Sequence, residues 1–165
     1  MTIQWVAPEQ SYRSYLQLHS LFSMLILGAI GIALYLFEVT PIHLVPWWAL
    51  VLIWLLLTLF FSVFFASRRF LFTAYARTEE AMHLKHGALF RSIRAVPLNR
   101  IQHVEYKQAF LERLFGIARL AIYTAGSGGA DLTLPGLAPD VAMRFKEELL
   151  TTIANEPTED VDGNE

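Results

Sequence analysis

The sequence predicts an α+β protein: a two-helix transmembrane hairpin, then a small domain of mainly antiparallel strands that a C-terminal helix covers. Two long apolar runs carry no charge, the segment after them alternates between apolar and polar residues, and the last segment has helical spacing. Hydrophobic residues make up 55% and charged residues 17% of the 165 positions. Average soluble domains are about 25% charged, so the composition excludes an ordinary soluble globule and chain-wide disorder.

The apolar runs span residues 18–37 and 47–66, each 20 residues long. At about 1.5 Å per residue, a helix of this length crosses the roughly 30 Å hydrocarbon core of a bilayer. The link between them holds Pro41 and Pro46, which end both helices. A cleaved signal peptide is the alternative for the first run, but only Arg13 precedes it and no small-residue cleavage pattern follows.

The basic residues near the ends of the runs predict the orientation of the hairpin. Arg13 precedes the first run, Arg68 and Arg69 follow the second, and the link has neither lysine nor arginine. By the positive-inside rule both termini lie in the cytoplasm. Gly28 and Gly31 give the first helix a small face that another helix could approach closely.

Charge and composition divide the chain into four parts. Residues 1–17 form a cytoplasmic segment, 18–67 the hairpin, 68–154 a cytoplasmic domain, and 155–165 an acidic tail. The domain holds twelve basic and eight acidic residues, whereas the tail holds five acidic residues and is expected to be disordered. The chain has no cysteine, which excludes disulfides, thiol nucleophiles and thiolate metal sites.

Alternation predicts the strands of the domain. The alternating segments are 70–75, 82–85, 88–95, 101–106, 120–124 and 131–134, with a turn at His86-Gly87 and a hairpin around 126–129. A short helical turn spans 109–115. The last helix begins at Pro139, and its expected core face is Val141, Phe145, Leu149 and Ile153.

Three motifs carry a family resemblance: Pro97-Leu-Asn-Arg-Ile-Gln-His-Val104, Leu114-Phe-Gly-Ile-Ala118 and Ile122-Tyr-Thr-Ala-Gly126. In this order after a membrane hairpin, they resemble the bacterial pleckstrin-homology-like membrane proteins of the YdbS-like group, from about Leu21 to Ile153. The resemblance implies a pleckstrin-homology-like fold, a seven-strand small β-sandwich or open barrel capped by the C-terminal helix. It also implies the bacterial inner membrane and a larger multi-domain relative as partner. The family supplies no catalytic residues.

Two groups of residues are candidates for binding. Arg100, Gln102 and Arg113 offer donors to an acidic partner or a lipid phosphate, since guanidinium is a planar fork that fits such groups. The alternative is that the Arg100–Gln102 strand and the Arg113–Gly116 turn fix each other by hydrogen bonds.

A second group combines Arg91 and Arg94 with Lys85 and Lys107. It is expected to form a basic face at the inner leaflet, where each base contributes about 1 kcal/mol toward an anionic surface. The alternative is a solvated face that only satisfies the positive-inside rule.

No motif in the sequence indicates a metal site, a phosphate-binding loop or a catalytic centre. His83 and His86 point to different faces and His103 stands alone, so no metal site is predicted. The glycine-rich stretch 126–129 lacks the lysine of a phosphate-binding loop and is read as a hairpin turn. We therefore expect no catalytic residue, no cofactor and no nucleic-acid partner.

The leading hypothesis is a non-enzymatic membrane protein that presents its domain for protein assembly, in a homo-oligomer or with a larger relative. The strand at Gln102–Lys107 is its candidate edge. The alternative is an anionic-lipid-responsive binding module at the inner leaflet. A membrane enzyme is the third hypothesis, and no polar cluster in the apolar runs supports it.

Overall fold

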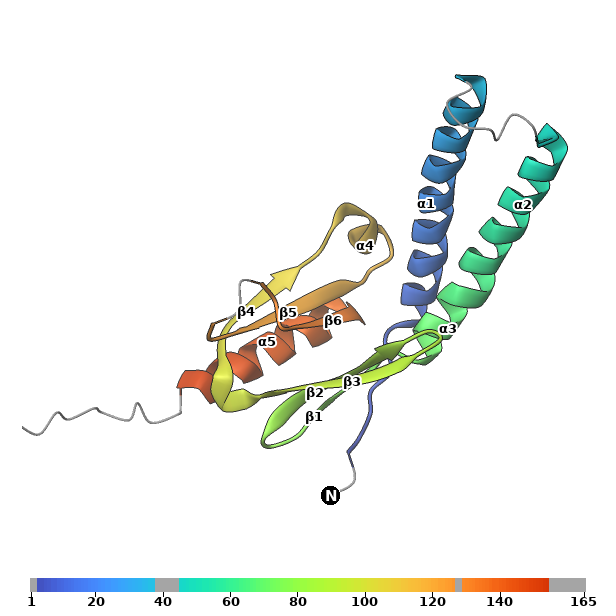
Figure 1. Ribbon diagram of the computed structural model, residues 1–165. Coiled ribbons are helices and arrows are strands. Elements are labelled where there is room, and N and C mark those ends of the chain that lie inside the picture. Colours follow the sequence, from blue (N-terminus) through green and yellow to red (C-terminus); the bar gives the residue numbers. More distant parts are fainter. Residues whose placement is uncertain (1–2, 38–44, 127–128, 155–165) are drawn as a thin grey trace, which may run out of the picture.

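The computed structural model describes residues 3–37, 45–126 and 129–154 and places a long helical hairpin beside a β domain (Figure 1). Helix α1 spans Gln10–Leu36. Helix α2 (Trp47–Leu59), the π-helical segment η2 (Phe60–Phe65) and helix α3 (Ala66–Leu71) follow one another as a single rod. Both rods are long and apolar enough to cross a membrane. Most of the expected link and the whole acidic tail lie outside the described residues.

The two rods contact each other through an indole. Trp54 Nε1 donates a hydrogen bond to the Met24 carbonyl across the hairpin, at 3.0 Å. Gly28 lies under the same ring, because a Cβ there would stand 2.8 Å from Nε1. The small face at Gly28 is therefore occupied by the chain's own second rod, whereas a Cβ at Gly31 would meet nothing within 4 Å.

The β domain consists of two three-stranded antiparallel sheets. The first has the order β1-β2-β3 and the second β4-β5-β6. The strands are β1 (Ala74–Arg77), β2 (Ala81–Gly87), β3 (Arg91–Pro97), β4 (Ile101–Lys107), β5 (Ala118–Thr124) and β6 (Leu132–Leu137). The 3-10 turn η3 (Leu98–Arg100) joins the sheets, α4 (Phe110–Leu114) lies between β4 and β5, and α5 (Pro139–Ala154) follows β6.

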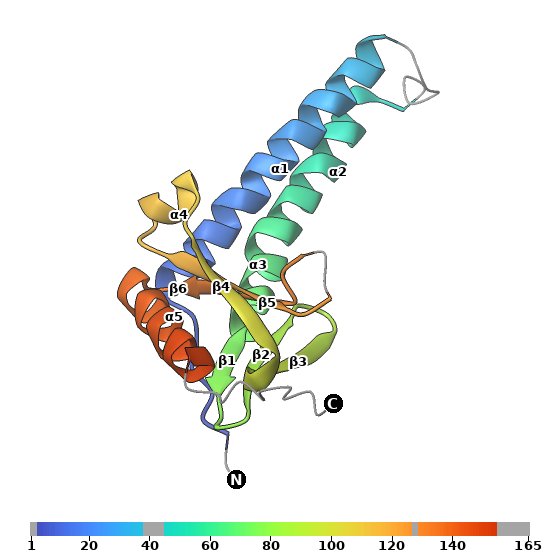
Figure 2. The same cartoon turned by 90° about the vertical axis from the view of Figure 1, so that its left-hand side faces the viewer.

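The core lies between the sheets and α5, which packs across the open side against β4 and β5 (Figures 1 and 2). Its fully buried members include Met82, Leu120, Ile122, Leu134 and Leu149. They come from β2, β5, β6 and α5, and the strand positions follow the predicted alternation. The predicted α+β fold of an open sandwich covered by a C-terminal helix is confirmed.

Two local predictions were wrong. Residues 70–75 do not form a strand from their start, because α3 continues to Leu71 and its last turn is closed by the Thr73 hydroxyl, 2.6 Å from the Arg69 carbonyl. Gly87 is not in the turn but pairs with Arg91 at the end of β2. A short apolar run fits the end of a helix as well as the start of a strand, so its pattern does not distinguish the two.

The described part of the chain forms six strands rather than the seven that the resemblance implies. Val6 adds a single antiparallel bridge to Tyr75 on the outer side of β1. The N-terminal segment therefore covers this edge in place of a further strand. On α5, Phe145 and Leu149 lie on the core as expected, while the side chain of Ile153 lies outside the described residues.

A second buried cluster joins the hairpin to the domain. We call it the junction; its buried members are Tyr12 and Leu16 of α1, Ala66 of α3 and Ile117. The Tyr12 ring lies on Gly136 of β6, which has a φ of +68° and would place a Cβ 2.5 Å from Tyr12 Cγ. The Glu9 amide also donates to the Gly136 carbonyl, at 2.8 Å. The start of α1 is thus fixed to β6.

Replacing Gly136 should weaken the junction. Gly136→Ala combines an unfavourable left-handed φ, worth about 1–2 kcal/mol, with overpacking against Tyr12, worth about 1–3 kcal/mol. Gly116→Ala is the matched control, because Gly116 has a φ of +63° and no atom within 4 Å of a Cβ. Thermal unfolding of the solubilised protein should show a clearly larger loss for Gly136→Ala. Equal losses would mean that the Tyr12 contact contributes nothing.

Candidate functional site

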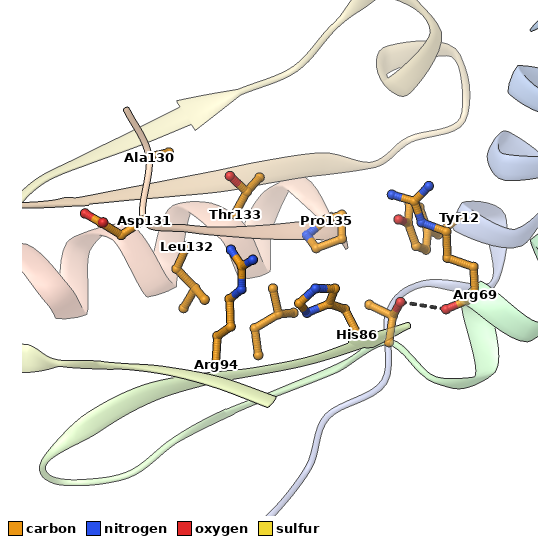
Figure 3. A pocket seen from close by; sticks show the side chains of 11 residues that line it. Tyr12, Arg69, His86, Arg94, Ala130, Asp131, Leu132, Thr133 and Pro135 are labelled. Atoms are coloured by element: carbon orange, nitrogen blue, oxygen red, sulfur yellow. Dashed lines mark hydrogen bonds between the residues drawn. The ribbon is translucent and has the colours of Figure 1, made fainter. Parts of the chain in front are cut away.

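A cavity of about 200 Å³ opens where the junction meets the two sheets (Figure 3). Its walls come from α1, the end of α3, the first sheet and the β6 side of the second sheet. The lining residues are Tyr12, Arg69, Thr73, Leu84, His86, Arg94, Ala130, Asp131, Leu132, Thr133 and Pro135. The cavity therefore exists only where the hairpin and the domain are held together.

Two arginines reach this cavity from opposite sides. Arg69 comes from the last turn of α3, and Figure 3 shows its side chain beside Tyr12. Arg94 comes from β3, where it pairs with the buried Leu84 of β2. Side chains two apart share a face of a strand, so Arg94 lies on the inner face with the buried Val96. Arg94 and Arg69 are both solvent-exposed, so the cavity that they line is open to water.

His86 stands between the two guanidinium groups. Burial in the cavity wall lowers its pKa from 6.5, and the charges of Arg94 and Arg69 lower it further. Its Nδ1 atom is buried and has no hydrogen-bond partner within the described part of the chain. The neutral ring can donate to or accept from an occupant of the cavity, depending on its tautomer.

Asp131 contributes the acidic group of the lining. Its Oδ2 accepts hydrogen bonds from the Thr124 amide at 2.8 Å and the Thr124 hydroxyl at 2.7 Å. These bonds tie the start of β6 to the end of β5. Two arginines against one carboxylate leave the lining with a net positive charge at neutral pH.

The size and donors of the cavity favour a small anion. Its 200 Å³ would hold several waters, each of about 30 Å³, but it is smaller than the roughly 300–1,000 Å³ of sites for drug-sized ligands. Guanidinium groups present planar donors that match phosphate oxygens. The arrangement can bind one phosphate-sized group.

Residues 22–152 match the family model described as the bacterial PH domain. The chain belongs to the bacterial PH domain family. No curated protein and no solved structure is significantly similar to it. The match begins within α1 and includes the rest of that helix, the second rod and both sheets, so most of the hairpin is matched together with the PH domain.

The structure divides the basic residues that the sequence groups together. Arg94 lines the cavity, but Arg91 lies on the opposite face of β3, with its guanidinium 4.1 Å from the Phe72 ring centre. Lys107 lies on the other sheet and forms an ion pair with Glu105 at 2.9 Å. Lys85 instead lies near the ring of Trp5. The four residues do not form one face.

Arg100, Gln102 and Arg113 are exposed and lie outside the cavity lining. Arg100 ends η3, Gln102 lies on β4 and Arg113 on α4. Their roles in binding remain predictions.

Sequence reasoning missed Glu112, which is buried, with 3% of its surface exposed. Its carboxylate accepts a hydrogen bond from the Ala109 amide at 2.8 Å and pairs with Arg119 Nε at 3.0 Å. Glu112 is the third residue of α4, a position from which a carboxylate often bonds back to the residue before the helix. That spacing was the signal available. The pair fixes α4 to β5.

The pKa of His86 should show which arginines lie near its ring in the cavity wall. We expect an NMR titration to give a value below 6.5, and Arg94→Gln to raise it because one nearby cation is removed. Arg91→Gln should leave it unchanged, since Arg91 lies on the other face of β3. Because the pKa of His86 is lower in the folded than in the unfolded state, this histidine lowers the free energy of unfolding as the pH falls below about 6.5. Well above that pH it has no effect on stability. An equal response to both variants would contradict this placement of Arg94.

Removing the Glu112 charge should loosen α4. Glu112→Gln keeps the side-chain shape but loses the ion pair with Arg119, and the expected loss is about 1–3 kcal/mol of unfolding free energy. The control is Glu105→Gln on the exposed pair with Lys107, where little change is expected. Chemical unfolding in micelles measures both. A Glu112→Gln protein as stable as the control would show that this pair does not hold α4.

Proposed function

We propose that this is a non-enzymatic protein of the bacterial inner membrane, and that its PH domain binds the phosphate of an anionic lipid headgroup in the basic cavity. The observation that carries the proposal is the convergence of Arg69 and Arg94 on one cavity, one from the end of the membrane hairpin and one from the PH domain. Membrane lipid is then both the solvent of the hairpin and the ligand of the domain.

The distribution of charge supports the cytoplasmic placement of both termini. Arg68 and Arg69 stand in the last turn of α3, directly after the apolar rod, and Arg13 stands near the start of α1. These ends meet at the junction, so the bases gather at one end of the hairpin. This end is expected to face the anionic inner leaflet.

The position of the cavity supports a headgroup as the source of the phosphate. Arg69 is only three residues beyond Ala66, which lies 20 residues into a rod that starts at Trp47. A helix needs about 20 residues to cross the hydrocarbon core, so Arg69 falls at the depth of the headgroups. A phosphate attached to a lipid reaches the cavity without leaving its leaflet.

Protein assembly is the second candidate function, and the sheet edges support it. Strand β3 ends the first sheet and β4 ends the second. Ile93 of β3 is 59% exposed, and an exposed edge with an apolar side chain can accept a strand from a partner. A second copy or a larger relative is the proposed partner.

Native mass spectrometry of the full-length protein with its lipids tests the headgroup proposal. We expect one phosphatidylglycerol to be retained in preference to phosphatidylcholine, and retention to fall with rising salt. Arg69→Gln combined with Arg94→Gln should weaken retention at least tenfold, since each lost charged hydrogen bond is worth about 1.5–3 kcal/mol.

The matched control is Arg91→Gln combined with Arg100→Gln, which removes the same charge outside the cavity. Equal losses in the two double variants would assign binding to net charge and overturn the cavity proposal. A defined oligomer without retained lipid would favour assembly instead.

A further inference from the structure

Helix α4 exposes apolar side chains that the fold leaves uncovered. Phe110 is 82% exposed and Leu114 is 70% exposed. They lie four residues apart and therefore share one side of this short helix. The buried Glu112 fixes α4 in place, so these two large apolar side chains stay exposed to water unless another molecule covers them.

Two measures place the membrane boundary at the level of the junction. About 20 residues cross the hydrocarbon core, and 20 residues counted back from the outer end of α1 at Leu36 end at Gln17, next to Leu16. Counting the same length forward from Trp47 reaches Ala66. Leu16 and Ala66 are members of one buried cluster, so both rods place the cytoplasmic boundary at the same level.

Helix α4 lies at this level. Phe115, which directly follows α4, packs edge-on against Tyr15 of α1 with 6.2 Å between ring centres. Figures 1 and 2 both show α4 beside the half of α1 nearest the domain. A membrane that surrounds the hairpin therefore reaches α4.

The charges of α4 also suit a lipid surface. Its acidic residue, Glu112, is buried and paired with Arg119, whereas its basic residue, Arg113, is exposed. An anionic leaflet repels exposed carboxylates and attracts arginine, whose long side chain can extend to the headgroups while its neighbours are immersed.

A second apolar pair stands beside the other rod. Leu89 and Phe90, in the turn between β2 and β3, are 62% and 88% exposed. The Arg91 guanidinium contacts the Phe72 ring and so holds this turn near the end of α3. The Arg68 guanidinium also lies over this ring, 4.7 Å from its centre. The two apolar pairs therefore lie beside different rods, one near α1 and the other near the end of α3.

We propose that Phe110 and Leu114 of α4, together with Leu89 and Phe90, insert into the cytoplasmic leaflet and hold the PH domain against the bilayer. The occupant of both patches is lipid, as for amphipathic segments that lie about 5–10 Å deep at the boundary between headgroups and acyl chains. The inference rests on the membrane insertion of the hairpin proposed above, but not on an anion in the cavity.

Site-directed spin labelling tests this insertion, because the chain contains no cysteine and each introduced cysteine is labelled alone. The variants are Phe110→Cys, Leu114→Cys and Phe90→Cys in the full-length protein, reconstituted in phosphatidylglycerol and phosphatidylcholine bilayers. The ratio of collisions with oxygen to collisions with a water-soluble nickel complex should be several-fold higher at these positions than at Leu150→Cys, a 41% exposed position near the far end of α5.

Ile30→Cys, within the apolar run of α1, distinguishes failure of the domain insertion from failure of the hairpin insertion. An oxygen-accessible label at 30 with water-accessible labels at 90, 110 and 114 would overturn the insertion of the domain and leave the hairpin in the membrane. A water-accessible label at 30 would overturn membrane insertion itself. Labels shielded from both reagents, with dipolar broadening between copies, would show that a second copy covers the patches and would also overturn the proposal.

Discussion

The contact between the start of α1 and the second sheet is the constraint on which the rest of the structure depends. Tyr12 lies on Gly136 at a distance that leaves no room for a Cβ, and Leu16 and Ala66 complete the contact with Ile117. Besides this contact, the hairpin and the PH domain are joined by the chain after Leu71, by the bridge of Val6 to Tyr75 and by the contact of Arg91 with Phe72. The junction packs the hairpin against the domain, and it creates the cavity, because Tyr12 and Arg69 form walls that the domain alone lacks.

A rigid junction also changes what weak surface contacts can achieve. A domain on a flexible tether pays for ordering each time it meets the membrane. Here Phe115 and Ile117 pack on α1 directly after α4, so the orientation is set when the protein folds. Small contributions from a headgroup in the cavity and from the exposed side chains of α4 then add on one surface, as linked binding sites do.

Local patterns predicted most of the fold, because span length, strand alternation and the opening of α5 at Pro139 are written within short windows of sequence. The prediction of a strand from residue 70 was wrong, because an apolar run that ends in a threonine fits both the end of a helix and the start of a strand. The candidate site was predicted only in part. Arg94 was singled out, but Arg69 was read only as a topology signal. The cavity joins side chains at positions 12, 69, 94 and 131, and only tertiary packing brings these together.

The separation of Arg91 from Arg94 follows from strand geometry. Positions three apart on a strand must point to opposite faces, so one basic face could not contain both. Arg91 turns outward and contacts Phe72, which ties the β2–β3 turn to the end of α3. Arg94 turns inward and faces the cavity. One strand thus supplies both the fastening of the first sheet to the hairpin and a charged group of the cavity, which explains why two residues of the same type have different environments.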